Sequence, residues 1–494
     1  MDSCADRRAR KRMERSYPML AEIKGLNEEC GVFGIWGHEE APQITYYGLH
    51  SLQHRGQEGA GIVATDGEKM SAHKGQGLIT EVFQNGELKK VKGKGAIGHV
   101  RYATAGGGGF ENVQPFLFHS QNNGSLALAH NGNLVNATQL KQQLENQGSI
   151  FQTSSDTEVL AHLIKRSGHF ELKDQIKNAL SMLKGAYAFL IMTEKEMIVA
   201  HDPNGLRPLS VAMLGDAYVV ASETCAFDVV GATYLRDVEP GEMLIINDEG
   251  MKSERFSINI NRSICSMEYI YFSRPDSNIN GINVHSARKN LGKKLAEESG
   301  IEADVVTGVP DSSISAAIGY AEATGIPYEL GLIKNRYVGR TFIQPSQSLR
   351  EQGVRMKLSA VRGVVEGKRV VMVDDSIVRG TTSRRIVTML REAGATEVHV
   401  RISSPPIAHP CFYGIDTSTH EELIASSHSV EEIRQEIGAD TLSFLSIEGL
   451  LSGIGRQYEG ENCGQCMACF TGKYPTEIYQ DTVLPHVKEI VLTK

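Results

Sequence analysis

The sequence contains no uninterrupted apolar stretch of about 20 residues, which is the length that a membrane-spanning helix requires. It also lacks an excess of positive charge, since the net charge is -8 and the pI is near 6.1. Proteins that track nucleic-acid phosphates need clustered basic residues, so nucleic acid is not expected as the main partner. No internal repeat or low-complexity tract is apparent. These absences leave an ordinary soluble chain of 494 residues, long enough for two or three domains.

The first 29 residues are rich in arginine but lack the apolar core of a secretory signal. An organellar transit peptide is an alternative for such a basic start. Four glutamates in the same segment disfavour it, because transit peptides are poor in acidic residues. We interpret residues 1–29 as a propeptide and expect a cytoplasmic protein.

Cys30 lies at the end of this leader, directly before the short apolar run 31–35. Cleavage after Glu29 would give Cys30 a free α-amine, which has a reference pKa of about 7.7 to 8.0 and can act as the general base for the thiol. Nucleophile and base would then share one residue. The alternative is an ordinary buried cysteine at the start of a strand.

Eight cysteines in so long a chain do not indicate a disulfide framework. Cys463, Cys466 and Cys469 lie within seven residues of one another, whereas Cys265 and Cys411 are isolated in sequence. The C-x-x-C spacing of Cys466 and Cys469 is typical of a metal site. A redox pair is the competing interpretation, but no thioredoxin-like context precedes it. Spacing alone leaves zinc and an iron-sulfur cluster open.

Short apolar runs separated by Gly and Asn turns predict strands from Cys30 to about Leu244, for example at 96–100, 125–129, 187–192 and 217–221. Helical patterns interrupt them in only two places, at 138–144 and from 156, where helices over 156–163 and 175–183 are expected. This mixture indicates an α+β layered domain with largely antiparallel sheets.

The pattern changes near residue 260, after which strands and helices alternate. The expected order is helix 286–298, strand 304–309, helix 313–323, strand 369–373, helix 382–393 and strand 397–402. Alternation with nearly continuous apolar strands is typical of an α/β domain with a doubly wound parallel sheet.

A candidate phosphate site follows the buried strand 370–373. Asp374 and Asp375 stand at its carboxyl end, where ligands bind in open α/β sheets. Gly380, Thr381 and Thr382 open the next helix, whose N-terminal amides suit a phosphate. The two carboxylates would face ribose hydroxyls or a magnesium ion. An acidic pair alone is weak evidence, because an N-cap with a solvated neighbour has the same pattern.

These motifs resemble a known family. Residues 370–382 resemble the thirteen-residue fingerprint of type I phosphoribosyltransferases, which bind phosphoribosyl pyrophosphate (PRPP), and the segment from Cys30 onward resembles the N-terminal-nucleophile glutaminases. In this order the chain resembles the glutamine PRPP amidotransferases, over essentially everything from Cys30 to Tyr474, and specifically the subtype with a propeptide and an iron-sulfur cluster.

The resemblance implies a fold, a set of domains and a reaction. An α+β four-layer αββα N-terminal-nucleophile hydrolase domain (30–260) would be followed by an α/β type I phosphoribosyltransferase domain (261–440) and a C-terminal segment (441–494). The expected activity converts glutamine, PRPP and water to 5-phosphoribosylamine, glutamate and pyrophosphate, the first step of de novo purine synthesis. Ammonia would pass from the Cys30 site to the PRPP site.

For the glutaminase half, the resemblance makes Cys30 the catalytic nucleophile. Asn131 and Gly132 match the oxyanion hole. Arg101 matches the clamp for the glutamine carboxylate, and Asp156 matches the partner of the glutamine amine. Without the resemblance, His-Asn-Gly would indicate a tight hairpin turn. Arg55 resembles a loop element near the nucleophile, and a structural ion pair is an equal alternative for it.

For the transferase half, the resemblance implies PRPP binding by the fingerprint and by a mobile flap over 334–341. The expected PRPP contacts are Asp374, Asp375, Gly380, Thr381, Thr382, Lys334 and Arg336. One magnesium ion per subunit would lie near Ser312, Asp374 and Asp375. The loop 310–313 resembles the pyrophosphate loop, in which Asp311 would have to turn away or cap the following helix.

The resemblance also selects a 4Fe-4S cluster, one per subunit, from the open metal alternatives. Its ligands would be Cys265, Cys411, Cys466 and Cys469, with Cys463 outside the matched set but close enough to leave the choice of pair in doubt. Such a cluster would be a structural staple, since the reaction transfers no electrons. The implied partners are glutamine, PRPP and purine nucleotides acting as feedback inhibitors, with no nucleic acid and no membrane, and the implied assembly is a homotetramer.

Overall fold

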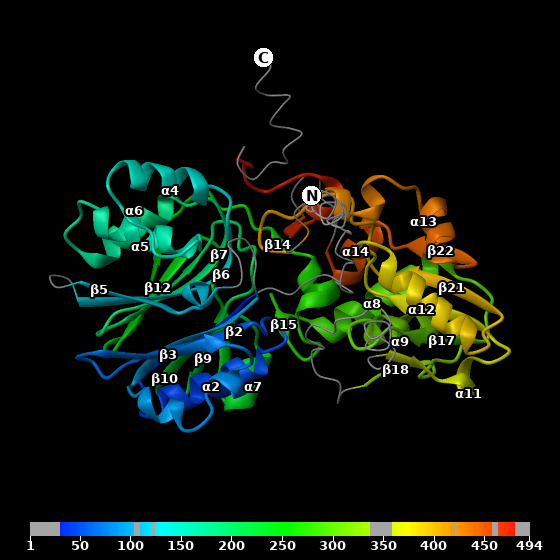
Figure 1. Ribbon diagram of the computed structural model, residues 1–494, viewed down its shortest axis with the longest axis horizontal. Coiled ribbons are helices and arrows are strands. Elements are labelled where there is room, and N and C mark those ends of the chain that lie inside the picture. Colours follow the sequence, from blue (N-terminus) through cyan, green and yellow to red (C-terminus); the bar gives the residue numbers. More distant parts are fainter. Residues whose placement is uncertain are drawn as a thin grey trace, which may run out of the picture.

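The structure, a computed structural model, describes residues 30–102, 109–120, 124–335, 358–415, 417, 420–456 and 463–479. Two antiparallel sheets and their helices form the N-terminal half, and a parallel sheet with its helices forms the C-terminal half (Figure 1). The expected propeptide, 1–29, lies outside the described residues, as do Arg336 and the rest of the expected flap through residue 341.

The first sheet has seven antiparallel strands in the order β11-β9-β10-β1-β4-β2-β3. Its strands are β1 (Gly31–Trp36), β2 (Gly59–Thr65), β3 (Met70–Gln76), β4 (Gly95–Arg101), β9 (Ser210–Leu214), β10 (Ala217–Ala221) and β11 (Thr233–Asp237). The strand that follows Cys30 is therefore central in its sheet, between β4 and β10.

The second sheet has six antiparallel strands in the order β13-β12-β8-β7-β6-β5. Its strands are β5 (Phe116–Ser120), β6 (Gly124–Leu134), β7 (Gly185–Met192), β8 (Met197–His201), β12 (Glu242–Asn247) and β13 (Gly250–Arg255).

The alternation of side chains along β1 explains why the two sheets stack. Val32 and Trp36 point into the apolar layer between the sheets, whereas Phe33 and Ile35 point into the layer on the other face. Successive side chains of a strand point to opposite faces, so a strand that is apolar throughout must be covered on both. The same holds for β7, and the sheets are accordingly sandwiched between helices.

Helices cover the outer face of each sheet, which gives four layers (Figure 1). The six-stranded sheet is covered by α4 (Ala137–Asn146), α5 (Thr157–Arg166) and α6 (Leu172–Met182), and the seven-stranded sheet by α2 (Ala41–Ser51), α3 (Ile79–Val82) and α7 (Cys225–Val230). The predicted αββα hydrolase fold is therefore confirmed.

The expectation of only two helical interruptions in this half was wrong, because it omits α2 and α7. Helix α2 begins with a proline in its first turn, as helices commonly do. Its middle carries β-branched and aromatic residues and Gly48, all of low helix propensity. Burial of Thr45 and Leu49 against the sheet stabilises the helix despite that weak local preference.

The C-terminal half contains a parallel sheet in the order β17-β20-β21-β22. Its strands are β17 (Val305–Gly308), β20 (Arg369–Asp374), β21 (Glu397–Ile402) and β22 (Thr441–Phe444). Its helices are α8 (Val284–Ser299), α9 (Ile314–Thr324), α11 (Arg362–Val365), α12 (Thr381–Glu392), α13 (Val430–Ile437) and α14 (Ile447–Ile454). The predicted parallel sheet is confirmed, and it extends past residue 440 through β22.

A small antiparallel pair joins β18 (Leu332–Lys334) to β19 (Leu358–Ala360), and another joins β15 (Asn278–Ile279) to β16 (Ile282–Asn283). Between the halves, β14 (Ile264–Cys265) runs into a π-helical turn, η4 (Glu268–Phe272). The late strand β23 (Gln465–Cys466) pairs with β14 in parallel and is followed by α15 (Ala468–Thr471). The last described part of the chain is thus attached to the junction of the two halves.

Within the described ranges, no helix is both long enough and apolar enough to cross a bilayer.

Candidate active site

Cys30 lies immediately before β1, at the edge where β4 ends. Its side chain is half-buried, and its Sγ is 3.7 Å from the carbonyl oxygen of Tyr102. Arg101, the last residue of β4, is buried with 6% exposure. The structure therefore brings the expected nucleophile and the end of the strand bearing the expected carboxylate clamp to one place.

Asn131 and Gly132 lie inside the long strand β6, opposite Ala188 and Tyr187 of β7. The hairpin alternative for this sequence is therefore wrong. Gly132 has a φ of +139°, and a Cβ there would lie 2.2 Å from the carbonyl oxygen of Ala186. Only glycine avoids both the strained backbone and the collision.

The side chain of Asn131 is fully buried and lies beside Ser222. Its Nδ2 is 3.5 Å from Oγ of Ser222, while its Oδ1 has no hydrogen-bond partner among the described residues. Oγ of Ser222 also accepts a hydrogen bond from the N–H of Val32, at 3.0 Å. Asn131 is therefore linked through one hydroxyl to the second residue after Cys30.

Asp156, the residue preceding α5, faces the same part of β6. Its Oδ2 accepts a hydrogen bond from the N–H of Leu134 at 2.8 Å, and its Oδ1 is 3.6 Å from Nδ1 of His130. Burial raises the pKa of this carboxyl, but His130, the Leu134 amide and the Thr157 hydroxyl outweigh burial and hold it below its usual value. Asp156 is thus an anion, as recognition of a substrate amine requires.

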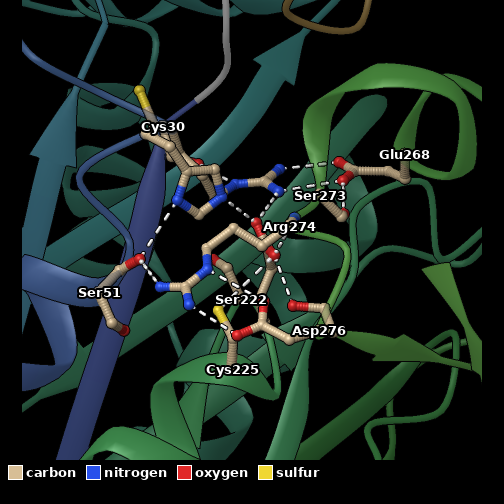
Figure 2. A network of polar contacts seen from close by, with 12 residues as sticks. Cys30, Ser51, Ser222, Cys225, Glu268, Ser273, Arg274 and Asp276 are labelled. Carbon is tan, nitrogen blue, oxygen red and sulfur yellow. Dashed lines mark hydrogen bonds and ion pairs between the residues drawn. The ribbon is translucent and has the colours of Figure 1, made fainter. Parts of the chain in front are cut away.

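Arg55 is buried next to the backbone of Cys30, in a network of charges that includes Glu268. Figure 2 shows this network with Cys30 and Glu268 labelled. The Nε of Arg55 donates to the carbonyl oxygen of Cys30 at 3.2 Å, and its Nη1 donates to Glu223 at 2.7 Å. Nη1 and Nη2 also donate to the two carboxylate oxygens of Glu268, at 3.0 and 2.8 Å. Both interpretations of Arg55 hold: it is a structural ion pair, and it touches the nucleophile's own residue.

Glu223 is the second anion of this network. Its carboxylate accepts hydrogen bonds from Ser277 at 2.7 Å and from the N–H of Arg274 at 2.9 Å, and His54 lies 2.7 Å away. Burial raises the pKa of Glu223. His54 and Arg55 lower it by more than burial raises it, so the pKa of this carboxyl lies far below its usual value. Sequence reasoning missed Glu223 and Glu268 because neither belongs to a local motif and both act only through residues distant in sequence.

In the second half, the loop after β17 and the end of β20 come together. The hydroxyl of Ser312 donates to Asp375, and the hydroxyl of Ser313 donates to Asp374 at 3.0 Å. Burial raises the pKa of both carboxyls, and in Asp374 the charge of Asp375 adds to the effect. Two buried acids of this kind favour a cation between them, and oxygen ligands are those that magnesium prefers.

The phosphate loop ends at Gly380, which has a φ of +77° and precedes the first residue of α12, Thr381. Thr381 is exposed and Thr382 half-buried, so the start of this helix faces solvent at the carboxyl end of β20. A helix start with free amides is a ready anion site. Nζ of Lys334 lies 2.9 Å from Oδ2 of Asp311, which shows that Asp311 turns toward a cation at the rim.

The four cysteines expected as cluster ligands line a single cavity at the junction of the halves. Its walls are Leu206, Arg207, Cys265, Cys411, Tyr413, Ile415, Cys466, Ala468 and Cys469. Cys265 and Cys466 are register partners in β14 and β23. Burial, then the neighbouring thiols, raise the pKa of Cys469 well above its usual value, and burial raises that of Cys466 to about 12.

Cys463 does not line this cavity, and its Sγ points instead to the carbonyl oxygen of Gln465, at 3.7 Å. In the part of the chain that the structure describes, no three Cys, His, Asp or Glu side chains converge as ligands of one metal ion. None of the seven described cysteines is assigned to a disulfide.

Comparisons with known proteins agree with this geometry. Residues 104–229 match the model of a glutamine amidotransferase domain, and residues 282–403 match that of a phosphoribosyl transferase domain. The chain is 94% identical over 476 residues to an amidophosphoribosyltransferase of Bacillus subtilis (strain 168), covering 96% of this chain and 100% of that one. It is 56% identical to an amidophosphoribosyltransferase of Staphylococcus aureus (strain COL), covering 93% of each.

A solved structure, the glutamine PRPP amidotransferase from B. subtilis complexed with ADP and GMP, superposes with a TM-score of 0.89 at 93% identity, covering 93% of this chain and 100% of that one. The two domain matches, the full-length identity and the shared fold lead to one conclusion: this chain belongs to the amidophosphoribosyltransferases, the glutamine-dependent enzymes that open purine biosynthesis.

Proposed function

We propose that the chain makes 5-phosphoribosylamine by a division of labour between Cys30 and the acidic pair of the second half. The thiol of Cys30 attacks the side-chain amide of glutamine, and water hydrolyses the resulting thioester to glutamate. The released ammonia attacks C1 of PRPP and displaces pyrophosphate. Ammonia in bulk water would be protonated, so a path closed to solvent between the sites is part of the proposal.

One observation carries the glutaminase part: a continuous set of contacts links the expected residues. Cys30 faces Tyr102 at the end of β4, and Val32 is joined through Ser222 to Asn131. Asp156 is bonded to the backbone three residues after Asn131. These contacts therefore connect strands β1, β4 and β6, which carry or flank the expected residues, as the assembly of an acyl-transfer site requires.

Asn131 would serve the oxyanion hole after its amide is turned about the last side-chain bond. Oγ of Ser222 already accepts from Val32, so its proton is free to be donated, and Oδ1 of Asn131 is a buried acceptor without a partner among the described residues. In the turned orientation the hydroxyl of Ser222 donates its proton to Oδ1 of Asn131. Nδ2 of Asn131 then no longer bonds Ser222 and can donate to the substrate. Amide orientation is assigned from the hydrogen-bond network, so this orientation is the better one. Nδ2 and the N–H of Gly132 would then stabilise the oxyanion.

For the transferase part, we propose that Ser312, Asp374 and Asp375 hold one magnesium ion. When bound, it supplies positive charge to the departing pyrophosphate. Gly380, Thr381 and Thr382 would bind the 5-phosphate at the start of α12, and Lys334, with Arg336 of the undescribed segment, would bind the pyrophosphate end. Arg101 and Asp156 would hold the two charged groups of glutamine.

We further propose that Cys265, Cys411, Cys466 and Cys469 hold a 4Fe-4S cluster, one per subunit. Support comes from the four thiols that line one cavity at the junction of the halves. These residues would supply the four thiolates by which such clusters are held. It would fasten β14, the 411–415 loop and α15 together.

The remaining features are proposals from the resemblance: removal of residues 1–29, a cytoplasmic location and a homotetramer. Purine nucleotides as feedback inhibitors have one added support, because the solved relative is described as complexed with ADP and GMP.

The decisive experiment compares wild type with Cys30→Ala. Wild-type protein should hydrolyse glutamine with PRPP and magnesium present, and mass analysis of active material should find Cys30 at the N-terminus. The alanine variant should lose glutamine-dependent activity but retain activity with ammonium salts. Active protein with residue 29 still attached, or glutamine turnover by the variant, would contradict the proposal.

A further inference from the structure

A single buried turn touches both halves of the molecule, and it contains Glu268. This residue is the first of the π-helical turn η4, between β14 and α8, and it is 0% exposed. π-Helical turns are uncommon and are frequently found at functional sites. The proposed function does not use this turn.

On the glutaminase side, the Glu268 carboxylate fixes the plane of Arg55 (Figure 2). The two oxygens accept from Nη1 and Nη2 at 3.0 and 2.8 Å, and Ser273 donates a further hydrogen bond to the same carboxylate. A guanidinium is rigid and planar, so a bidentate carboxylate on one edge sets the direction of the N–H on Nε. That N–H donates to the carbonyl oxygen of Cys30 at 3.2 Å.

On the transferase side, Arg288 of α8 holds both ends of the turn. Its Nε donates to the carbonyl oxygen of Tyr269 at 2.8 Å and its Nη2 to that of Ser273 at 2.7 Å. Arg288 is 2% exposed.

We propose that Glu268 is a positioning residue of the glutaminase reaction, which holds Arg55 on the Cys30 carbonyl, and that Arg288 anchors the turn that carries Glu268. The inference rests on the proposed function, because it assumes that Cys30 is the nucleophile.

The physical reason for the effect is the position of the Cys30 carbonyl. Arg288 holds the turn through two carbonyl groups, the turn carries Glu268, and Glu268 holds the guanidinium of Arg55. A shift of Arg55 would therefore displace the residue that carries the nucleophile, and small displacements of a reacting group lower the rate strongly.

The main variant is Glu268→Gln, which keeps the shape but cannot accept two guanidinium bonds. Its matched control is Glu242→Gln, because Glu242 is also a buried glutamate, 4% exposed, and accepts from both Nη1 and Nη2 of Arg236 at 2.8 Å in a remote sheet. Glutamine hydrolysis should lose about tenfold or more in kcat in Glu268→Gln, with KM for glutamine within about twofold of wild type. Its ammonia-dependent rate should match that of the control.

The second variant, Arg288→Lys, keeps the charge but cannot hold two carbonyl groups with one planar fork. We expect glutamine hydrolysis and the alkylation rate of Cys30 by iodoacetamide to fall by about threefold or more in this variant, with KM for glutamine within about twofold of wild type. Alkylation is located by mass spectrometry, so this readout is independent of turnover.

Equal kinetics of Glu268→Gln and Glu242→Gln, or losses in both half-reactions that parallel thermal unfolding, would overturn the proposal. If Glu268→Gln yields no folded protein, an unchanged alkylation rate of Cys30 in Arg288→Lys overturns the proposal alone, and a reduced rate supports it. Cys30→Ala separates the two levels: glutamine turnover by that variant defeats the proposed function, whereas loss of turnover in Cys30→Ala together with wild-type kinetics in Glu268→Gln defeats only this inference.

Discussion

Asn133 and Phe412 join the two halves of the molecule at the glutaminase site: Nδ2 of Asn133 donates to the carbonyl oxygen of Phe412 at 2.9 Å. Asn133 follows the expected oxyanion residues on β6, and Phe412 follows Cys411. The loop that carries one cysteine of the cavity therefore rests on the strand that carries Asn131 and Gly132. We therefore expect substitutions that distort the cavity to lower glutaminase activity as well.

Ser222→Ala tests the orientation of the oxyanion amide. Loss of one oxyanion donor costs about a hundredfold to a thousandfold in kcat, and loss of the group that orients it should cost about tenfold to a hundredfold. We expect this fall in kcat for glutamine hydrolysis with little change in KM. Ser210→Ala is the control, because Ser210 is a buried serine of the same sheet whose hydroxyl bonds Asp237 instead. Identical kinetics in the two variants would refute the assigned role.

Cys411→Ser tests the cluster. Removing one of four ligands should abolish stoichiometric iron and the broad visible absorption of an iron-sulfur protein, and should lower the unfolding temperature, because metal binding contributes directly to folding. Cys463→Ser is the matched control and should keep iron and colour, because Cys463 does not line the cavity. Metal analysis with absorption spectra decides the matter. Colourless wild-type protein with stoichiometric zinc would defeat the cluster assignment.

Asp374→Asn tests the magnesium site. With one of two buried carboxylates removed, the magnesium concentration needed for half-maximal ammonia-dependent activity should rise by about tenfold or more. Basal glutamine hydrolysis, measured without PRPP, should persist. Asp304→Asn is the control, since Asp304 pairs with Arg369 at the opposite end of β20. A magnesium titration that shifts equally in both variants would rule out a specific ligand.

Glu158 provides a pH-dependent prediction. Its carboxylate accepts hydrogen bonds from the backbone N–H groups of Gln152 and Thr153, at 2.9 and 2.8 Å, and so fixes the loop before Asp156. Burial raises its pKa, but His162 and these hydrogen bonds outweigh burial and lower it to about 2. A lowered pKa stabilises the fold above the ordinary value of 4.5, and this stability is lost as the pH falls toward about 2.

Glu158→Gln should therefore destabilise the protein by about 1 to 3 kcal/mol at neutral pH. The gap in unfolding free energy from wild type should shrink below about pH 4, where the wild-type carboxyl begins to lose its advantage. Denaturant unfolding at several pH values measures this gap. Glu145→Gln, on the exposed face of α4, serves as the control. A gap independent of pH would show that the charge of Glu158 is unimportant.

The parts of the fold that local patterns determine were predictable from the sequence. The strand at β20 and the helix at α12 have strong periodicity and a glycine at the required turn, and both were expected within about two residues. Helix α2 was not predicted, because its aromatic and β-branched residues favour a strand locally and only packing on the sheet makes it helical.

The residues of the candidate site divide in the same way, into those that a local motif indicates and those that only the folded structure brings together. Cys30 and the acidic pair stand in recognisable motifs, so sequence indicates them directly. Ser222, Glu268 and Arg288 have no such motif, because each acts by contacting a residue far away in the chain. Asn131 and Gly132 were assigned through resemblance, while their local sequence favoured a turn that the pairing of β6 with β7 excludes.

The parallel pairing of β14 with β23 has a consequence for biosynthesis. During translation, Cys265 leaves the ribosome long before its register partner Cys466. The nascent chain therefore cannot pair β14 with β23 until Cys466 has been synthesised, and a cluster that needs all four thiols cannot be completed before then. A stop codon before residue 465 would yield chains that lack this joint between the halves.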